Sequence, residues 1–166
     1  LLESVIVRYV KDKSVLDVGA GSGVLSEKAR NAGAKSVLAS DINPNTIELL
    51  KQKNISAIKS NLFSKIKKSQ KFDLIICNPP YLPEDKREPK ESQLATTGGK
   101  KGDEFILKLL KQAKSRLNKN GKILLLLSSL TPKNKIKILL TKNNLTHKTI
   151  ASKKIFFETL EIWEIK

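Results

Sequence analysis

The sequence predicts an α/β protein: a doubly wound, mostly parallel seven-stranded sheet with helices on both faces and an antiparallel C-terminal hairpin. Three observations support this fold class. Apolar strand-sized runs alternate with helix-sized segments along the 166 residues, a pattern typical of a parallel sheet. The run FDLIIC, residues 72–77, is almost entirely apolar, as in a strand buried on both faces. No helical segment separates the last two expected strands, so they should form an antiparallel pair.

Each element is indicated by local signals along the chain. Strand character is found at residues 14–18, 36–40, 55–59, 72–77, 123–128, about 145–151 and about 156–165. Helical patterns cover residues 22–31, 43–53, 103–117 and 131–143. Asn43 is a good N-cap with Pro44 at the first helical position, and Gly33 ends the helix before it. Residues 82–101 are polar and contain Pro and Gly, so we expect an irregular loop there, and a loop of this length is usually either functional or disordered.

Length and composition fit one compact domain over residues 1–166, with 39% hydrophobic and 29% charged residues. The longest apolar run, residues 123–127, is far shorter than the roughly 18 residues that span a bilayer. We therefore expect a soluble, cytoplasmic protein without a membrane partner. The lone Cys77 excludes an internal disulfide and, with one His, leaves little scope for a metal site. The chain has no Met, so we expect an N-terminal segment before Leu1 to be missing.

The net charge of +16 leaves two interpretations of the surface open. A basic surface attracts phosphate, which favours a nucleic-acid partner. However, 28 of the 32 basic residues are Lys and only 4 are Arg. This choice fits a solvated, Lys-rich surface better than a groove built to recognise phosphate.

A glycine-rich segment, VLDVGAGSGVLS at residues 15–26, directly follows the first expected strand. Gly19, Gly21 and Gly23 let the backbone turn sharply and approach a ligand closely. The spacing does not fit the nicotinamide-dinucleotide fingerprint, because its third glycine is missing. The pattern D-x-G-x-G-x-G from Asp17 instead resembles the cofactor loop of class I methyltransferases, which bind S-adenosyl-L-methionine. That resemblance implies that this backbone, including Ala20, faces the methionine part of the cofactor.

Two further segments extend this cofactor prediction. Asp41 ends the second expected strand, 22 residues after Gly19, where a carboxylate can accept hydrogen bonds from both ribose hydroxyls. The alternative role for Asp41 is to cap the following helix. In many relatives an Asp after the third strand binds the adenine amino group, and here Asn61 takes its place. The resemblance also places Ile42 and Leu62, beside these two residues, at the cofactor.

The apolar run at residues 72–77 stops at Asn78-Pro79-Pro80-Tyr81. An amide or exocyclic amino nitrogen is a poor nucleophile because its lone pair is delocalised. Two fixed acceptors for its N–H groups, the Asn78 side-chain carbonyl and the Pro79 backbone carbonyl, would aim that lone pair at a methyl group. Pro80 stiffens the turn, and Tyr81 offers a flat surface to a planar group. The motif therefore predicts a clamp for a planar –NH2 group beside the cofactor; a plain proline turn is the alternative.

The Asn-Pro-Pro-Tyr motif resembles the signature of methyltransferases that act on planar nitrogens of glutamine, adenine or cytosine. TTGGKKGDEFILKLL (residues 96–110) resembles the Gly-Gly-x-x-Gly segment of release-factor glutamine methyltransferases. SDINP (residues 40–44) and IFFETLEIWEIK (residues 155–166), with its Glu-Thr-Leu stretch, resemble the archaeal and eukaryotic branch of that family. This resemblance implies a Rossmann-like methyltransferase fold and methylation of the Gly-Gly-Gln glutamine of a peptide chain release factor. S-adenosyl-L-homocysteine would be the product. It also implies a heterodimer with a small zinc-binding activator subunit, which we place at the edge strand 55–59.

Two alternatives stay open from the sequence. An adenine or cytosine methyltransferase acting on RNA or DNA is favoured by the charge of +16, whereas the small size of the chain, without a target-recognition domain, opposes base flipping. A non-catalytic scaffold of the same fold is the second alternative. We expect no catalytic role for His147, a surface or edge-strand residue, or for Cys77, a core residue.

Overall fold

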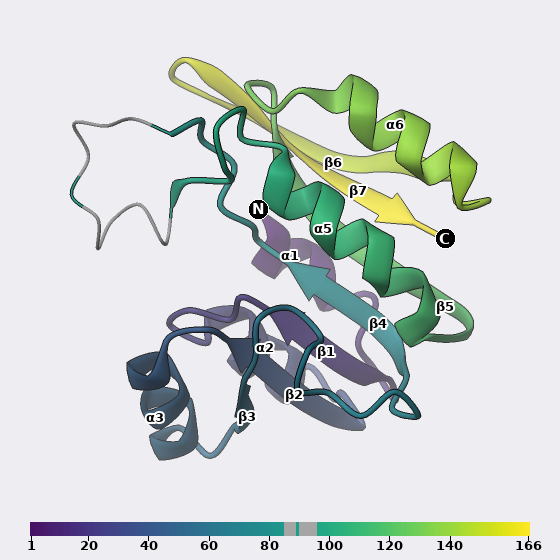
Figure 1. Ribbon diagram of the computed structural model, residues 1–166. Coiled ribbons are helices and arrows are strands. Elements are labelled where there is room, and N and C mark those ends of the chain that lie inside the picture. Colours follow the sequence, from purple (N-terminus) through teal and green to yellow (C-terminus); the bar gives the residue numbers. More distant parts are fainter. Residues whose placement is uncertain (85–88, 90–95) are drawn as a thin grey trace.

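The computed structural model of the chain describes residues 1–84, 89 and 96–166. Seven strands form one sheet in the order β3-β2-β1-β4-β5-β7-β6 (Figure 1). Their bounds are β1 Ser14–Val18, β2 Ser36–Asp41, β3 Ser56–Lys59, β4 Phe72–Cys77, β5 Leu117–Ser128, β6 His147–Ile155 and β7 Glu158–Ile165. The first five strands of this order pair in parallel, whereas β7 is antiparallel to β5 and to β6. The predicted fold class is confirmed.

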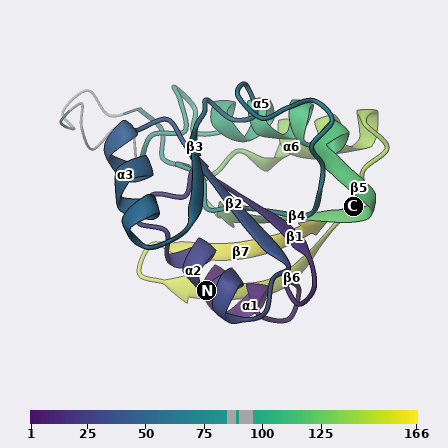
Figure 2. The same cartoon turned by 90° about the horizontal axis from the view of Figure 1, so that it is seen from below.

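Helices cover both faces of the sheet, as Figure 2 shows, with α1 and α2 on one side and α5 and α6 on the other. The helices are α1 Leu2–Ile6, α2 Val24–Asn31, α3 Pro44–Gln52, α5 Glu104–Ala113 and α6 Lys133–Lys142. The sequence did not predict α1, because five residues are too few to show helical periodicity. Among the residues that the structure describes, no helix is long and apolar enough to cross a membrane.

Strand β4 lies in the middle of the core, which explains its apolar sequence. Leu74 and Ile76 belong to the buried cluster that includes α1 and α2 residues, whereas Ile75 and Cys77 belong to the cluster that includes α5 and α6 residues. Successive side chains of a strand point to opposite faces, so a strand covered on both faces needs apolar residues at every position. Burial of each such side chain stabilises the fold by about 1.5–3 kcal/mol. The prediction that Cys77 is a core residue is confirmed.

Some predicted boundaries are wrong, most clearly in the C-terminal hairpin. We expected a strand from Phe156, but β6 runs to Ile155 and β7 begins only at Glu158. Ile155 and Glu158 are paired in register, so Phe156 and Phe157 form the two-residue turn between the strands. Aromatic residues have a high strand propensity, and the sequence pattern therefore favoured a strand where the chain turns. The predicted helix 103–117 likewise ends at Ala113, before a short 3-10 turn.

The sheet has two edge strands of different character, β3 and β6. The N–H of Ser60 donates to the carbonyl of Asp41, at the end of β2. Alternate residues of a parallel strand face the same neighbour, so the N–H groups of Ala57 and Lys59 point away from β2 toward the open edge. Strand β6 instead carries three exposed lysines along the opposite edge, at positions 148, 153 and 154. His147 lies on β6 as predicted, stacked on Trp163 with ring centroids 4.0 Å apart.

Candidate active site

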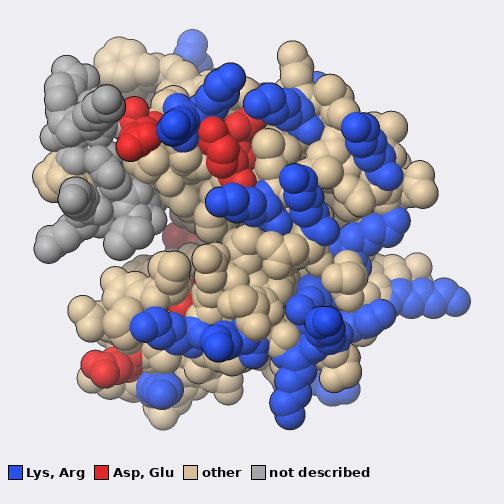
Figure 3. All heavy atoms as spheres, viewed as in Figure 1, with Lys and Arg blue, Asp and Glu red and all other residues tan. Residues whose placement is uncertain are grey.

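The loops that follow β1, β2 and β4 meet at one end of the sheet. Asp17 of β1 pairs with Ile76 of β4, so the glycine-rich loop and the Asn78 motif leave neighbouring strands at the same level. The connections of β1 and β4 run to opposite faces, and ligands of such sheets bind in the crevice at this switch point. Figure 3 shows the surface hollowed on this side, between the parts formed by α3 and α5.

The three glycines of the first loop have different roles. All have a positive φ, +72° for Gly19, +51° for Gly21 and +81° for Gly23, which side chains other than glycine adopt at a cost. A Cβ atom on Gly19 or Gly21 would meet nothing within 4 Å, whereas one on Gly23 would lie 2.5 Å from Cδ2 of Leu50. Gly19 and Gly21 therefore border open space that a ligand could fill, and Gly23 lets the loop pack against α3.

Asp41 connects the glycine-rich loop to α3. Its Oδ2 accepts a hydrogen bond from the N–H of Gly21 at 3.0 Å, and its Oδ1 accepts one from the N–H of Asn43 at 2.9 Å. Asn43 in turn caps α3 by accepting from the N–H of Asn45 at 3.0 Å, as predicted. A carboxylate offers about four lone-pair sites, so Asp41 can hold the loop and still accept hydrogen bonds from a ligand.

Asp17 is fully buried beneath this loop. Ser26 Oγ donates to its Oδ2 at 2.6 Å, while its buried Oδ1 has no hydrogen-bond partner among the residues that the structure describes. Burial raises the pKa of Asp17 to about 6; the hydrogen bonds from Ser26 oppose this shift, and the charge of Asp41 adds to it. A buried, unpaired carboxylate oxygen is costly. The unpaired Oδ1 of Asp17, beneath the loop of Gly19 and Gly21, thus fits a ligand that brings a hydrogen-bond donor or a positive charge.

The other predicted cofactor residues differ in their exposure. Asn61 is exposed directly after β3, and 52% of Ile42 is exposed after β2. Ala20 is half-buried and packs against the small cluster around Leu50. Leu62 is buried in the main core with φ of +51°. Asn61 and Ile42 thus offer surface to a ligand, whereas Leu62 contributes mainly to packing.

A pocket of about 210 Å³ lies at the end of β4, with a lining of Asn78, Pro79, Pro80, Tyr81, Leu82 and Thr96. Asn78 is exposed and Pro79 is buried. The pocket thus brings together all four residues of the predicted clamp and adds two that the sequence did not indicate. A larger hollow of about 560 Å³ includes Lys114, Asn118 and Lys166. It lies at the amino-terminal end of β5, away from these loops.

The Gly-Gly-x-x-Gly segment supports this pocket from behind. A Cβ atom on Gly98 would lie 2.7 Å from the carbonyl oxygen of Pro80, and one on Gly102 would lie 2.6 Å from that of Tyr81. The N–H of Gly98 donates to the carbonyl of Leu82 at 2.9 Å. Glycine is needed here for close approach of two backbones. The rest of the predicted loop, residues 85–88 and 90–95, lies outside the described residues.

Glu158 and Ser128 hold the side chain of Tyr81, and the sequence analysis missed both. The Tyr81 hydroxyl donates to Oε1 of Glu158 at 3.4 Å, and Ser128 Oγ donates to Oε2 of the same carboxylate. Burial and the charge of Glu158 raise the pKa of Tyr81, so the phenol stays protonated as a donor. Glu158 lies 77 residues beyond Tyr81. The signal in the sequence that could have indicated its role is its position as the Glu of the Glu-Thr-Leu stretch.

Comparison with known proteins confirms the resemblance seen in the sequence. A protein of Methanocaldococcus jannaschii assigned as a protein N5-glutamine methyltransferase is 39% identical over 130 residues, which cover 74% of this chain and 65% of the relative. The release factor glutamine methyltransferase of Aquifex aeolicus is 31% identical over 142 residues, or 75% of this chain and 50% of the relative. The chain thus spans between half and two thirds of the length of these two relatives.

A solved structure and a family model extend the comparison to nearly the whole chain. The structure of the E. cuniculi Mtq2–Trm112 complex, described as responsible for the methylation of the eRF1 translation termination factor, superposes with a TM-score of 0.80. It is 23% identical and the match covers 99% of this chain and 92% of that one, which shows a shared fold. The family model of the methyltransferase small domain matches residues 1–157. The chain therefore belongs to the methyltransferase small domain family.

Proposed function

We propose that the protein is an S-adenosylmethionine-dependent methyltransferase acting on the glutamine of the Gly-Gly-Gln loop of a peptide chain release factor. The observation that carries this proposal is the pocket formed by Asn78 to Tyr81 at the end of β4, the strand that pairs with β1, which leads into the glycine-rich loop. The names of the relatives from Methanocaldococcus jannaschii and Aquifex aeolicus support glutamine as the acceptor.

The chain's residues divide the binding of S-adenosylmethionine among three loops. Gly19 and Gly21 would face its methionine part, with the unpaired Oδ1 of Asp17 available to the ammonium group. Asp41 would accept the ribose hydroxyls, and the exposed Asn61 amide would accept from the adenine amino group. When bound, the cofactor supplies an electrophilic methyl group and leaves as S-adenosylhomocysteine.

The pocket residues orient the acceptor amide. The Asn78 side-chain oxygen and the Pro79 backbone oxygen would accept the two N–H groups of the glutamine amide, and the Tyr81 ring would lie against its plane. Holding both N–H groups directs the nitrogen lone pair toward the methyl carbon, in line with the sulfur that leaves. The amide nitrogen held in this way would form its bond to the methyl carbon as the carbon–sulfur bond of the cofactor breaks, and it would release one proton to solvent.

Labelled S-adenosylmethionine identifies the acceptor. We expect label on an intact archaeal-type termination factor, with the small partner subunit present, and we expect nuclease treatment to leave the label unchanged. Replacing the Gln of the Gly-Gly-Gln loop with Ala should remove it. Label that survives this replacement but disappears with nuclease would reject the protein acceptor.

A second candidate is methylation of an exocyclic amine of RNA or DNA. The net charge of +16 favours it. Figure 3 shows Lys and Arg spread over both halves of the face drawn, with acidic side chains between them. Over the described residues of that face, this distribution is typical of a solvated Lys-rich surface and does not form one basic groove. The nuclease treatment above distinguishes a nucleic-acid acceptor from a protein acceptor.

A small zinc-binding partner subunit would add a strand at the β3 edge. The supporting observation is that the N–H of Ala57 points outward along an edge strand, where an added strand can accept its hydrogen bond. Ala57→Pro removes that donor without removing a hydrogen bond to β2, so it should abolish co-purification. Ala57→Ser keeps the N–H and is the matched control. Undiminished co-purification of Ala57→Pro would place the interface elsewhere.

A further inference from the structure

The tip of the β6–β7 hairpin is built against the usual rules for turns. Phe156 and Phe157 are its two turn residues, between the paired Ile155 and Glu158. Phe156 has a φ of +34°, whereas Phe157 is not among the residues with a positive φ, and two-residue turns with a positive φ at the first position favour glycine there. The two side chains are 95% and 97% exposed. The fold gains almost no burial from either ring, and such a local conflict points to a function outside the fold.

The hairpin tip lies at the same end of the molecule as the acceptor pocket. Strand β7 is antiparallel to β5, so its first residue lies at the carboxyl-terminal end of the parallel strands, as Figure 1 shows. That first residue, Glu158, accepts the hydrogen bond from Tyr81 of the pocket. Phe157 is its neighbour in the chain. The exposed aromatic pair is therefore joined directly to the residue that holds a wall of the pocket.

The pocket is too small to account for recognition of a whole protein. Its volume of about 210 Å³ is below the roughly 300–1,000 Å³ of pockets that enclose drug-sized ligands, and suits a single amide side chain. Two Phe rings can each bury about 150–250 Å². An acceptor protein that inserts one glutamine would gain much of its contact area from these rings.

We propose that Phe156 and Phe157 form a docking arm for the acceptor protein, outside its glutamine loop. This inference rests on the proposed function. The arm fits a protein surface with an apolar depression for the two rings, whose centroids are 6.5 Å apart. The exposed Lys153 and Lys154 beside the turn fit an acidic rim around that depression.

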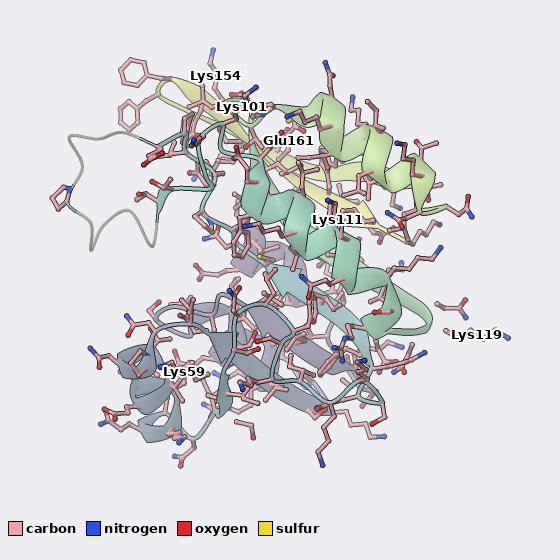
Figure 4. The ribbon with its side chains drawn as sticks, in the orientation of Figure 1. Lys59, Lys101, Lys111, Lys119, Lys154 and Glu161 are labelled. Atoms are coloured by element: carbon pink, nitrogen blue, oxygen red, sulfur yellow. The ribbon has the colours of Figure 1, made fainter. Side chains whose placement is uncertain are left out.

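The arm and the expected partner edge lie at opposite sides of the sheet. Figure 4 labels Lys154 on β6 and Lys59 on β3, the two outermost strands. The acceptor protein at the hairpin tip and the partner subunit at β3 can thus bind at the same time, because they do not compete for one surface.

The test replaces the aromatic pair with residues that suit this turn, in the double variant Phe156→Gly with Phe157→Asn. Because glycine is preferred at a first turn position with a positive φ, we expect a Tm equal to or above that of the unchanged protein and unaltered cofactor affinity. Binding of the intact termination factor should weaken by about tenfold or more, measured by titration independently of turnover. KM for the factor should rise in parallel, while kcat stays within about threefold.

Ile138→Asn is the control, because it replaces another exposed apolar side chain, 56% exposed on α6, that is not part of the docking arm. This variant should bind the factor as tightly as the unchanged protein. Equal factor binding by the turn variant, or no factor binding by the unchanged protein, would overturn the inference. The inference would also be overturned if sedimentation showed the unchanged protein to be a dimer and the turn variant to be a monomer, because the two rings would then contact a second copy of the chain. If the factor binds through the arm but is not labelled on its Gln, the proposed activity fails and the docking arm stands.

Discussion

The glycine-rich loop and the pocket lined by Asn78 to Tyr81 follow neighbouring strands, β1 and β4, yet they are built in different ways. The loop is held by contacts that are close in sequence: Ser26 lies 9 residues from Asp17, and Gly21 lies 20 residues from Asp41. The pocket depends on a bond between Tyr81 and Glu158, 77 residues apart. A ligand site can thus be encoded in a short motif, while the site beside it depends on the packed fold.

Asn78→Ala gives the largest expected effect and separates the two sites. In our proposal the change removes one of two acceptors that hold the substrate amide, so turnover should fall by about a hundredfold or more. Cofactor affinity should stay within about tenfold, or ~1.4 kcal/mol. Calorimetry and a label-transfer assay on the same sample measure both. Transfer at close to the original rate would reject the clamp.

Asp17→Asn tests the buried acid on the loop side through the pH dependence of stability. The folded pKa of about 6 lies above the ordinary value of 3.8. The contribution of Asp17 to the free energy of unfolding is therefore fully present below pH 4. It is lost as the pH rises through 6, and the total loss is about 3 kcal/mol. Asn stays neutral, so the free energy of unfolding of the unchanged protein, relative to the variant, should fall by this amount between pH 4 and 7. Denaturant unfolding at several pH values measures it, and a flat difference would contradict the prediction.

Asp41→Ala should disturb the loop and leave the acceptor pocket intact. It removes acceptors for Gly21 and, in our proposal, for the ribose, so cofactor binding should weaken by about 1.5–3 kcal/mol. The domain should stay folded. Glu48→Ala removes an exposed acid from α3 and is the matched control for charge. Unchanged affinity in a folded Asp41→Ala variant, measured by calorimetry, would reject the ribose assignment.

Gly102→Ala should disturb the acceptor pocket from outside its lining. The added Cβ would lie 2.6 Å from the carbonyl oxygen of Tyr81, so we expect KM for the acceptor to rise about tenfold, or ~1.4 kcal/mol. Gly33→Ala is the matched control: its φ of +87° is as unfavourable, but its Cβ would meet only Lys11 Cγ at 3.9 Å. Gly33→Ala should lose about 1–2 kcal/mol of stability from its φ alone, and Gly102→Ala should lose more, because its Cβ also crowds the backbone of Tyr81. Equal kinetics in both would show that crowding at Tyr81 is unimportant.

Glu158→Gln should give the smallest effect on activity. It tests most directly whether the pocket depends on the bond between Tyr81 and Glu158. An amide can accept from Tyr81 or from Ser128 but presents N–H groups to the other, so the loss should be about 0.5–1.5 kcal/mol in acceptor kcat/KM. Adding Tyr81→Phe should cost little more, because both changes remove the same bond. Glu161→Gln, on the same strand but bonded to Trp163 and Lys133, is the control. Fully additive losses would mean that the two residues act independently.

The sequence predicted the parts of this molecule that depend on local patterns. The strands, the Asn43 cap, the glycine turns and the four-residue motif after β4 all have short-range signals. The alternation of strands and helices predicted a mostly parallel sheet, and the edge position of β3 was implied by the family resemblance. The hairpin turn was misplaced because Phe156 and Phe157 follow strand propensity rather than turn chemistry. The roles of Gly98, Gly102 and Glu158 were missed because close backbone approach and a bond across 77 residues leave no periodicity in the sequence.

The contrast between the two sheet edges also sets how many chains can assemble. The outward N–H groups of Ala57 and Lys59 can donate hydrogen bonds to one further strand beside β3. At β6 the exposed lysines 148, 153 and 154 repel the approach of a second, equally basic chain. Growth by strand addition is thus open in one direction and closed in the other. A complex formed in this way should stop at a stoichiometry of one to one instead of extending into a filament.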